Sequence, residues 1–308
     1  MWKIFFSLST LASMLRMSAP LAFATMGACF GHKARIFNIG MESYVLVSAF
    51  FSTLGSYLFN SPWIGLLFGM LAGIVMSAIF GTFVLHLKAD PIVVGIAMNL
   101  SASALTSLLL LNVFKTRGSF MSDKIASFGR VQLPLLDRVP VLNAIFNNHY
   151  SIVYVAFLTV IVVHVLMYHT PFGLRIRGIG INEYASQSVG ISVTGYKWYS
   201  LILTGLLTGA AGACLPLCGL NMFTEDMSAG KGFLAVSAAR IGVGDPFKAM
   251  IACFVFSYAE ALSVSLQSFQ LPPQIVLMAP YLVTVVVMCL SSLKQFRRTK
   301  KAPMSLTK

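Results

Sequence analysis

The chain has few charged groups, and acidic residues are the scarcest of them. Of 308 residues, 22 are Lys or Arg and 9 are Asp or Glu, so 10% are charged, whereas soluble domains carry about 25%. With 57% hydrophobic residues, too little polar surface remains to cover a soluble core, and disorder is excluded as well. Apolar runs of about 20 residues recur, each long enough to span a bilayer. The composition therefore predicts an all-α, polytopic bundle of transmembrane helices.

Signatures of catalysis and of metal binding are also lacking. The Gly230-Lys231-Gly232 segment does not have the spacing of a phosphate-cradling Walker motif. Cys214 and Cys218 lie four residues apart, but no His or carboxylate is spaced to complete a tetrahedral metal site. The loops are too short to hold a catalytic domain. The sequence thus predicts no enzyme, no catalytic residue, no metal and no cofactor, and the five cysteines are interpreted as packing residues.

Hydropathy predicts eight full spans and one shorter segment. Residues 227–243 are apolar but short, with glycines at both ends, which is typical of a broken or re-entrant crossing. Counting it gives nine crossings instead of eight, with the N-terminus outside the cell. In that orientation 14 of the 22 basic residues lie inside, as the positive-inside rule expects. The eight full spans are predicted at 9–29, 39–58, 62–86, 91–114, 150–168, 197–218, 246–266 and 273–293.

The whole chain, residues 1–308, is predicted to be one transmembrane domain. Its parts outside the bilayer are an extracytoplasmic loop at about 115–149, a cytoplasmic segment at about 169–196 and a basic cytoplasmic tail at 294–308. The net charge is +13, and the basic tail contributes to it. We interpret the tail as an anchor on the cytoplasmic membrane surface, so the expected partner is lipid and not nucleic acid. The tripeptide Gly-Ala-Cys occurs twice, at Gly27–Cys29 and at Gly212–Cys214, as an inverted repeat would allow.

The cytoplasmic segment has the pattern of a short helix lying across a loop. Asn182 is a good N-cap residue, and Gly190 stands where such a helix would end. Two interpretations fit this pattern equally well on the residues alone. The helix either docks the chain onto a motor subunit or rests passively at the membrane interface.

Five segments, spread over nearly the whole chain, resemble the signature motifs of one transporter family. They occur in the family's order, on matching hydropathy, although Ser43 stands where the first motif usually has Gly. The chain therefore resembles the permease subunits of bacterial ABC importers for nucleosides, simple sugars and branched-chain amino acids, most of all the shorter permease of nucleoside importers. The segments are Ile36–Glu42 (N-I-G-x-E), Val94–Asn99 (G-I-x-x-N), Thr170–Arg177 (T-x-F-G-L-x-x-R), Gly230–Phe233 (G-x-G-F) with the later turn at Gly244–Pro246, and Pro280-Tyr281 with Thr284 (P-Y-x-x-T).

This resemblance implies a function and a set of partners. The chain would form the solute path of an ATP-driven importer in the bacterial cytoplasmic membrane, with nucleosides as the expected solutes and ribose-like sugars as the alternative. A cytoplasmic ABC ATPase would bind the ATP. A second permease subunit, identical or related, and an extracytoplasmic binding protein or lipoprotein would complete the complex. A different class, the ion-coupled secondary transporter, would require an ionisable relay facing one cavity, and the sequence has only scattered ionisable groups.

Polar residues within or beside the predicted spans are candidates for the solute path. Asn38 and Glu42, four residues apart, can face one cavity, and Asn99 is a weaker candidate. Glu42 either lines the path, braces the broken helix or only complements a helix dipole. Glu260, inside an apolar run, is expected either to face protein or water or to be protonated, and Arg16 and Arg240 are its candidate partners.

The candidate ATPase-coupling residues all lie between 173 and 190. Arg175 and Arg177 point apart on a helix and are assigned to anchoring against headgroups or the ATPase rim. Asn182 is the cap, Glu183 complements the dipole, and Tyr184 with Gln187 forms the exposed contact face. The complete set is Gly173, Arg175, Arg177, Asn182, Glu183, Tyr184, Gln187 and Gly190.

Overall fold

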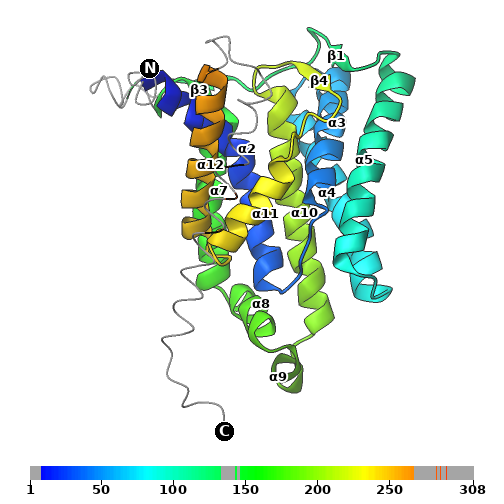
Figure 1. The fold of residues 1–308 in the computed structure, drawn as a ribbon, viewed down its shortest axis with the longest axis vertical. Helices are drawn as coiled ribbons and strands as arrows, with labels where there is room; N and C mark the ends of the chain where they lie inside the picture. The colour runs from blue at the N-terminus through cyan, green and yellow to red at the C-terminus, as the bar shows by residue number, and fades with distance from the viewer. Residues whose placement is uncertain are drawn as a thin grey trace.

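The computed structural model describes residues 8–132, 143, 146–266, 282, 285 and 289, and within them the chain is a bundle of helices (Figure 1). The predicted all-α class is confirmed. Most of the predicted last span, 273–293, and the whole tail, 294–308, lie outside the described residues. The helices are α2 (Leu8–Lys33), α3 (Met41–Phe59), α4 (Pro62–Gly81) with the π-turn η1 (Thr82–His86), α5 (Pro91–Phe114), α7 (Ser151–Tyr168), α8 (Pro171–Ile181), α9 (Glu183–Ser188), α10 (Val193–Leu217), α11 (Lys231–Ile241) and α12 (Pro246–Leu266).

Two small antiparallel strand pairs, which the sequence did not predict, close one end of the bundle (Figure 1). The strand β1 (Ser119–Met121) pairs with β4 (Met222–Thr224), and β2 (Arg130–Val131) pairs with β3 (His149–Tyr150). These pairs tie the loop after α5 to the segments beside α7 and α10. Because each strand has only two or three residues, no alternating pattern is long enough to reveal it in the sequence.

Five helical segments in the described part of the chain are long and apolar enough to cross a membrane: Pro62–His86, Pro91–Phe114, Ser151–Tyr168, Val193–Leu217 and Pro246–Ser265. The predicted spans 9–29 and 39–58 are helical as α2 and α3 but are not among these five. Both are also largely buried. Helices in the middle of a bundle contact protein and not lipid, so they can carry more Ser, Thr and Gly.

Small residues set the closest helix contacts, as the glycine spacing predicts. Gly69 and Gly73 of α4 face Gly205 and Gly209 of α10, so that a Cβ added to Gly209 would lie 2.6 Å from the carbonyl oxygen of Gly69. Any side chain there would push the two backbones apart. The i, i+4 glycines are therefore packing residues.

The segment predicted as a broken crossing contains the short helix α11. Its 11 residues span about 16 Å, roughly half of a bilayer's hydrocarbon core. The chain from Cys218 to Gly230 is irregular apart from β4, and α11 then packs against α2, α3 and α12. A backbone break of this kind is tolerated at membrane depth only where protein or water satisfies its polar groups. The residues that satisfy them are described below.

Candidate coupling and translocation sites

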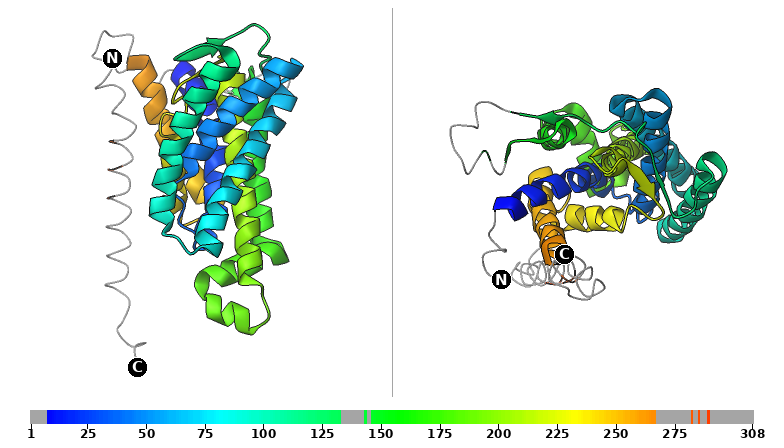
Figure 2. Two further views of the ribbon diagram at one scale, coloured as in Figure 1. Left: turned by 90° about the vertical axis from the view of Figure 1, so that its right-hand side faces the viewer. Right: turned by 90° about the horizontal axis from the view of Figure 1, so that it is seen from above.

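The helices α8 and α9 project beyond the other helices at the end opposite the strand pairs (Figure 2). The hydroxyl of Thr170 accepts a hydrogen bond from the Gly173 amide at 3.2 Å and caps α8, with Pro171 in the first turn. A Cβ on Gly173 would collide with the carbonyl oxygens of Leu166 and Met167. This glycine therefore permits the tight turn that directs α8 away from α7.

The second helix, α9, is capped as predicted and is also tied to the bundle. The Asn182 side chain accepts a hydrogen bond from the Ala185 amide at 3.1 Å. Glu183 forms an ion pair with Lys197 of α10 at 2.7 Å, in addition to the predicted match with the helix dipole. Gly190 follows α9 with φ of +80°, a backbone conformation that favours glycine. A cap, an ion pair and a glycine turn thus fix the orientation of α9.

The surface of this projecting segment is more apolar than the sequence analysis assumed. Tyr184 is 84% exposed, and Gln187 is exposed one turn along. Ile181 and Val189, which flank α9 and were not among the candidates, are 79% and 73% exposed. An exposed apolar patch with a polar rim is typical of a protein-binding surface. We name Ile181, Tyr184, Gln187 and Val189 the α9 patch.

The two arginines of α8 point apart, and each lies over a tyrosine of the same chain. Arg175 donates a hydrogen bond to the Tyr196 hydroxyl, and its guanidinium lies 5.7 Å from the centre of that ring. Arg177 lies 4.7 Å from the ring centre of Tyr168. These contacts direct the guanidinium groups toward α10 and α7, and neither arginine belongs to the α9 patch.

Asn38 and Asn99 hold the irregular entry to α3. The Asn38 amide donates to the Tyr44 hydroxyl at 3.0 Å and its oxygen accepts from the Gly40 amide at 2.9 Å. Asn99 of α5 accepts from the Ser43 amide and donates to the Ile39 carbonyl, at 3.0 and 3.2 Å. Both side chains are thus engaged in bonds to residues 39–44.

Glu42 reaches across to the start of the broken helix. Its two carboxylate oxygens accept hydrogen bonds from the amides of Gly230 and Gly232, each at 2.7 Å. Gly230 has φ of +78° and provides no side-chain cap of its own. The carboxylate therefore takes the place of the N-cap of α11, where a negative charge also suits the helix dipole. Of the three interpretations of Glu42, the brace for the broken helix matches these contacts, and the position of Glu42 in the first turn of α3 also fits the dipole interpretation.

Glu260 has a different partner from those expected. Its carboxylate forms an ion pair with Lys231 at 2.5 Å, with side-chain exposures of 24% and 14%. Arg16 instead donates to Ser13, and Arg240 lies 4.7 Å from the ring centre of Phe37. The prediction of Arg16 or Arg240 was wrong, because α11 enters the bundle with its first residue beside α12. Lys231, like Ile181 and Val189, is a functional candidate that the sequence did not indicate.

Removing only one charge of this ion pair should lower the free energy of unfolding more than removing both charges. Lys231→Met leaves the Glu260 charge half-buried and uncompensated, a change that typically costs about 3–5 kcal/mol. We expect a clear loss of thermal stability in Lys231→Met and a substantial recovery in Lys231→Met/Glu260→Gln, measured by thermal unfolding in detergent. Unaltered melting of the single variant would show that the pair does not hold α11 to α12.

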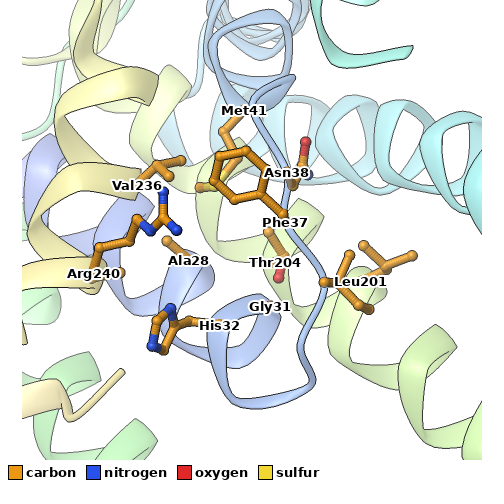
Figure 3. A pocket seen from close by; sticks show the side chains of 12 residues that line it. Ala28, Gly31, His32, Phe37, Asn38, Met41, Leu201, Thr204, Val236 and Arg240 are labelled. Carbon is orange, nitrogen blue, oxygen red and sulfur yellow. The ribbon is translucent and has the colours of Figure 1, made fainter. Parts of the chain in front are cut away.

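A narrow cavity lies between α2, the 36–41 segment, α10 and α11 (Figure 3). Asn38, Thr204 and Arg240 are among its lining residues. Its volume is about 30 Å³, room for one or two water molecules. This cavity cannot hold a larger solute.

Comparisons with known proteins agree with this architecture. Residues 10–288 match the family described as the branched-chain amino acid transport system permease component. The chain belongs to this family. The permease is therefore a multi-pass membrane protein of the bacterial cell membrane and a transport component of an ABC transporter, not an enzyme, and the secondary-transporter alternative was wrong.

Named relatives cover most of the permease. It is 32% identical to the nucleoside ABC transporter permease protein NupC of Lactococcus lactis, over 91% of this chain and 90% of that protein. It is 30% identical to the guanosine ABC transporter permease protein NupQ of Bacillus subtilis, over 88% of each. An inward-facing ABC transporter structure, 16% identical, superposes with a TM-score of 0.51 over 95% of this chain and 88% of that one. At that identity the likeness concerns the fold alone.

Proposed function

We propose that this permease forms the membrane path through which nucleosides are imported at the expense of ATP hydrolysed by a separate ATPase. The observation that carries the choice of solute is the 30–32% identity, over about nine tenths of the chain, to permeases named for nucleosides and guanosine. Sugars are the second candidate, because a relative in Haloferax volcanii ascribed to glucose transport is 23% identical over 92% of this chain.

Within this proposal the permease has nine crossings, with α11 as the broken one and the N-terminus outside. The projecting α8–α9 segment then lies in the cytoplasm, together with Lys33, Arg35 and Lys248 at the same end. A second permease subunit and an extracytoplasmic binding protein complete the importer. The internal repeat stays a prediction.

The coupling part of the proposal rests on the α9 patch. Its apolar side chains are exposed at the cytoplasmic end, and the ATPase is the partner that would cover them. Closure of the ATPase on ATP binding would push α9, and the Glu183–Lys197 ion pair would pass that movement to α10. The hydrogen bonds from Glu42 to the start of α11 would keep the break in place while the helices move.

The solute can be tested in the bacterial host of the permease. A strain lacking the permease gene should lose uptake of tritiated guanosine, and the restored gene should bring it back. Unlabelled uridine should compete with guanosine, and ribose or glucose in the same excess should not. Loss of ribose uptake in the deletion strain with guanosine uptake intact would replace nucleosides by sugars as the solute.

A further inference from the structure

A second pocket, which shares only His32 with the narrow cavity, opens at the proposed cytoplasmic end. It has a volume of about 460 Å³ and lies between the end of α2, the helix α8 and the turn that joins α11 to α12. Pockets that hold small ligands typically have about 300–1,000 Å³. Its lining residues are His32, Lys33, Arg35, Tyr168, Arg177, Gly180, Ile181 and Val243.

Three of the lining side chains are cationic: Lys33 ends α2, Arg35 lies in the segment that follows it, and Arg177 belongs to α8. Lys33 and Arg177 both lie over the ring of Tyr168, with their charged groups 5.9 and 4.7 Å from its centre. The positive charge of Lys33 suits the C-terminus of α2, but that helix end does not account for Arg35 or Arg177. Holding like charges together costs free energy unless an anion offsets them.

One carboxylate of the same chain, that of Asp245, partly neutralises the positive charge of these three side chains. Asp245 lies in the α11–α12 turn and interacts electrostatically with Lys33. Burial would raise the pKa of Asp245, but hydrogen bonds from the Lys248 amide and the Tyr168 hydroxyl, with the Lys248 charge, hold it below its usual value. It is therefore ionised at neutral pH, and it offsets one of the three lining cations.

One buried donor and two left-handed residues lie beside the pocket. The Nε of Arg177 is buried and has no hydrogen-bond acceptor within the described part of the chain. Arg35 and Val243, which both line the pocket, have φ of +55° and +54°. Left-handed backbone is unusual for any side chain and a true outlier for a β-branched one. Both are explained by helix termination: the amides of Arg35 and Ile36 bond to the carbonyls of His32 and Gly31 at the end of α2, and those of Val243 and Gly244 bond to Arg240 and Ala239 at the end of α11.

We propose that this pocket binds a phosphate-bearing anion, either a free one in the cytoplasm or the headgroup of an anionic lipid. The excess of positive charge and the volume both suit a tetrahedral oxyanion, and arginine pairs with phosphate in a bidentate manner. A bound anion would bridge the end of α2 to α8. Since α8 leads into the α9 patch, occupancy would restrain the segment proposed to meet the ATPase.

The test uses the purified full-length chain in maltoside micelles, with inorganic pyrophosphate and phosphatidylglycerol as separate probes. Pyrophosphate affinity is followed by the shift of the melting temperature, and retained lipid by native mass spectrometry. The variant is Arg35→Asn/Arg177→Gln, in which Asn tolerates the left-handed backbone at 35. Lys88→Gln, which removes a cation outside the pocket but also at a positive-φ residue, is the matched control.

The double variant should bind its probe about tenfold or more weakly, because it loses charge-assisted hydrogen bonds, while Lys88→Gln binds as the wild type does.

Pyrophosphate binding that phosphatidylglycerol does not displace identifies a free anion as the ligand. Lipid retention that blocks pyrophosphate identifies the headgroup. If the double variant misfolds, Arg35→Asn alone provides the comparison. Equal binding of both probes by the pocket variant and by Lys88→Gln would overturn the proposal. The readout needs neither transport nor ATPase, so it stands or falls independently of the nucleoside assignment.

Discussion

Replacing Tyr184 and Gln187 together by Asp is expected to abolish solute uptake and permease-stimulated ATP hydrolysis at the same time. Tyr184 is the most exposed large side chain of the α9 patch, and a tyrosine that becomes buried in an interface often contributes about 2 kcal/mol or more. Two carboxylates at that place would have to lose their hydration without a partner. The complex with the ATPase should therefore dissociate, while the permease still inserts and melts normally.

The measurement is co-purification of the ATPase from membranes, together with uptake and hydrolysis in proteoliposomes. Lys88→Asp is the control, since it introduces an acid into another exposed loop and reverses a charge without touching α9. It should retain the ATPase and most of the uptake. If uptake is lost in Tyr184→Asp/Gln187→Asp while the ATPase still co-purifies with unaltered hydrolysis, the docking surface lies elsewhere on the permease.

Substitution of Glu42 is expected to have the second largest effect. Glu42→Ala leaves the amides of Gly230 and Gly232 without an acceptor, at a cost of about 1–3 kcal/mol for each buried group. Glu42→Gln keeps one acceptor and turns a donor toward the other amide. If the lost hydrogen bonds raise the free energy of the arrangement with α11 in place by about 1.4 kcal/mol, the fraction of transport-competent molecules falls tenfold. Uptake should therefore fall about tenfold or more in Glu42→Gln and further in Glu42→Ala.

The chain offers a matched control for this experiment. Glu225 also accepts a hydrogen bond from a glycine amide, that of Gly118 at 3.1 Å, but in an exposed loop, where water can replace it. Glu225→Gln should leave uptake and melting temperature nearly unchanged. Uptake and thermal unfolding are measured on all three variants at equal expression. Full activity of Glu42→Ala would mean that the start of α11 needs no acceptor from α3 and that Glu42 has no role in the path.

Several features of this permease follow from local sequence alone. The helices match the apolar windows because about 20 apolar residues form a helix in lipid whatever their neighbours do. Asn182 caps α9 because an N-cap depends on the residues that follow it within one turn. The short α11 and the glycine contacts of α4 with α10 were also predictable, from length and from i, i+4 spacing.

The partners of charged groups far apart in the chain were decided by the tertiary structure. Glu42 and Gly230 are 188 residues apart, and Lys231 and Glu260 are 29 apart, so no periodicity links them. The sequence placed Glu260 in an apolar run and required a partner, but which cation supplies it depends on where α11 enters the bundle. The pocket formed by Lys33, Arg35 and Arg177 likewise exists only because α8 folds back beneath α2. Local sequence fixes which segments are helical, because backbone bonding in lipid is satisfied within each helix. Packing alone fixes which polar groups meet, because their free energy depends on contacts between helices.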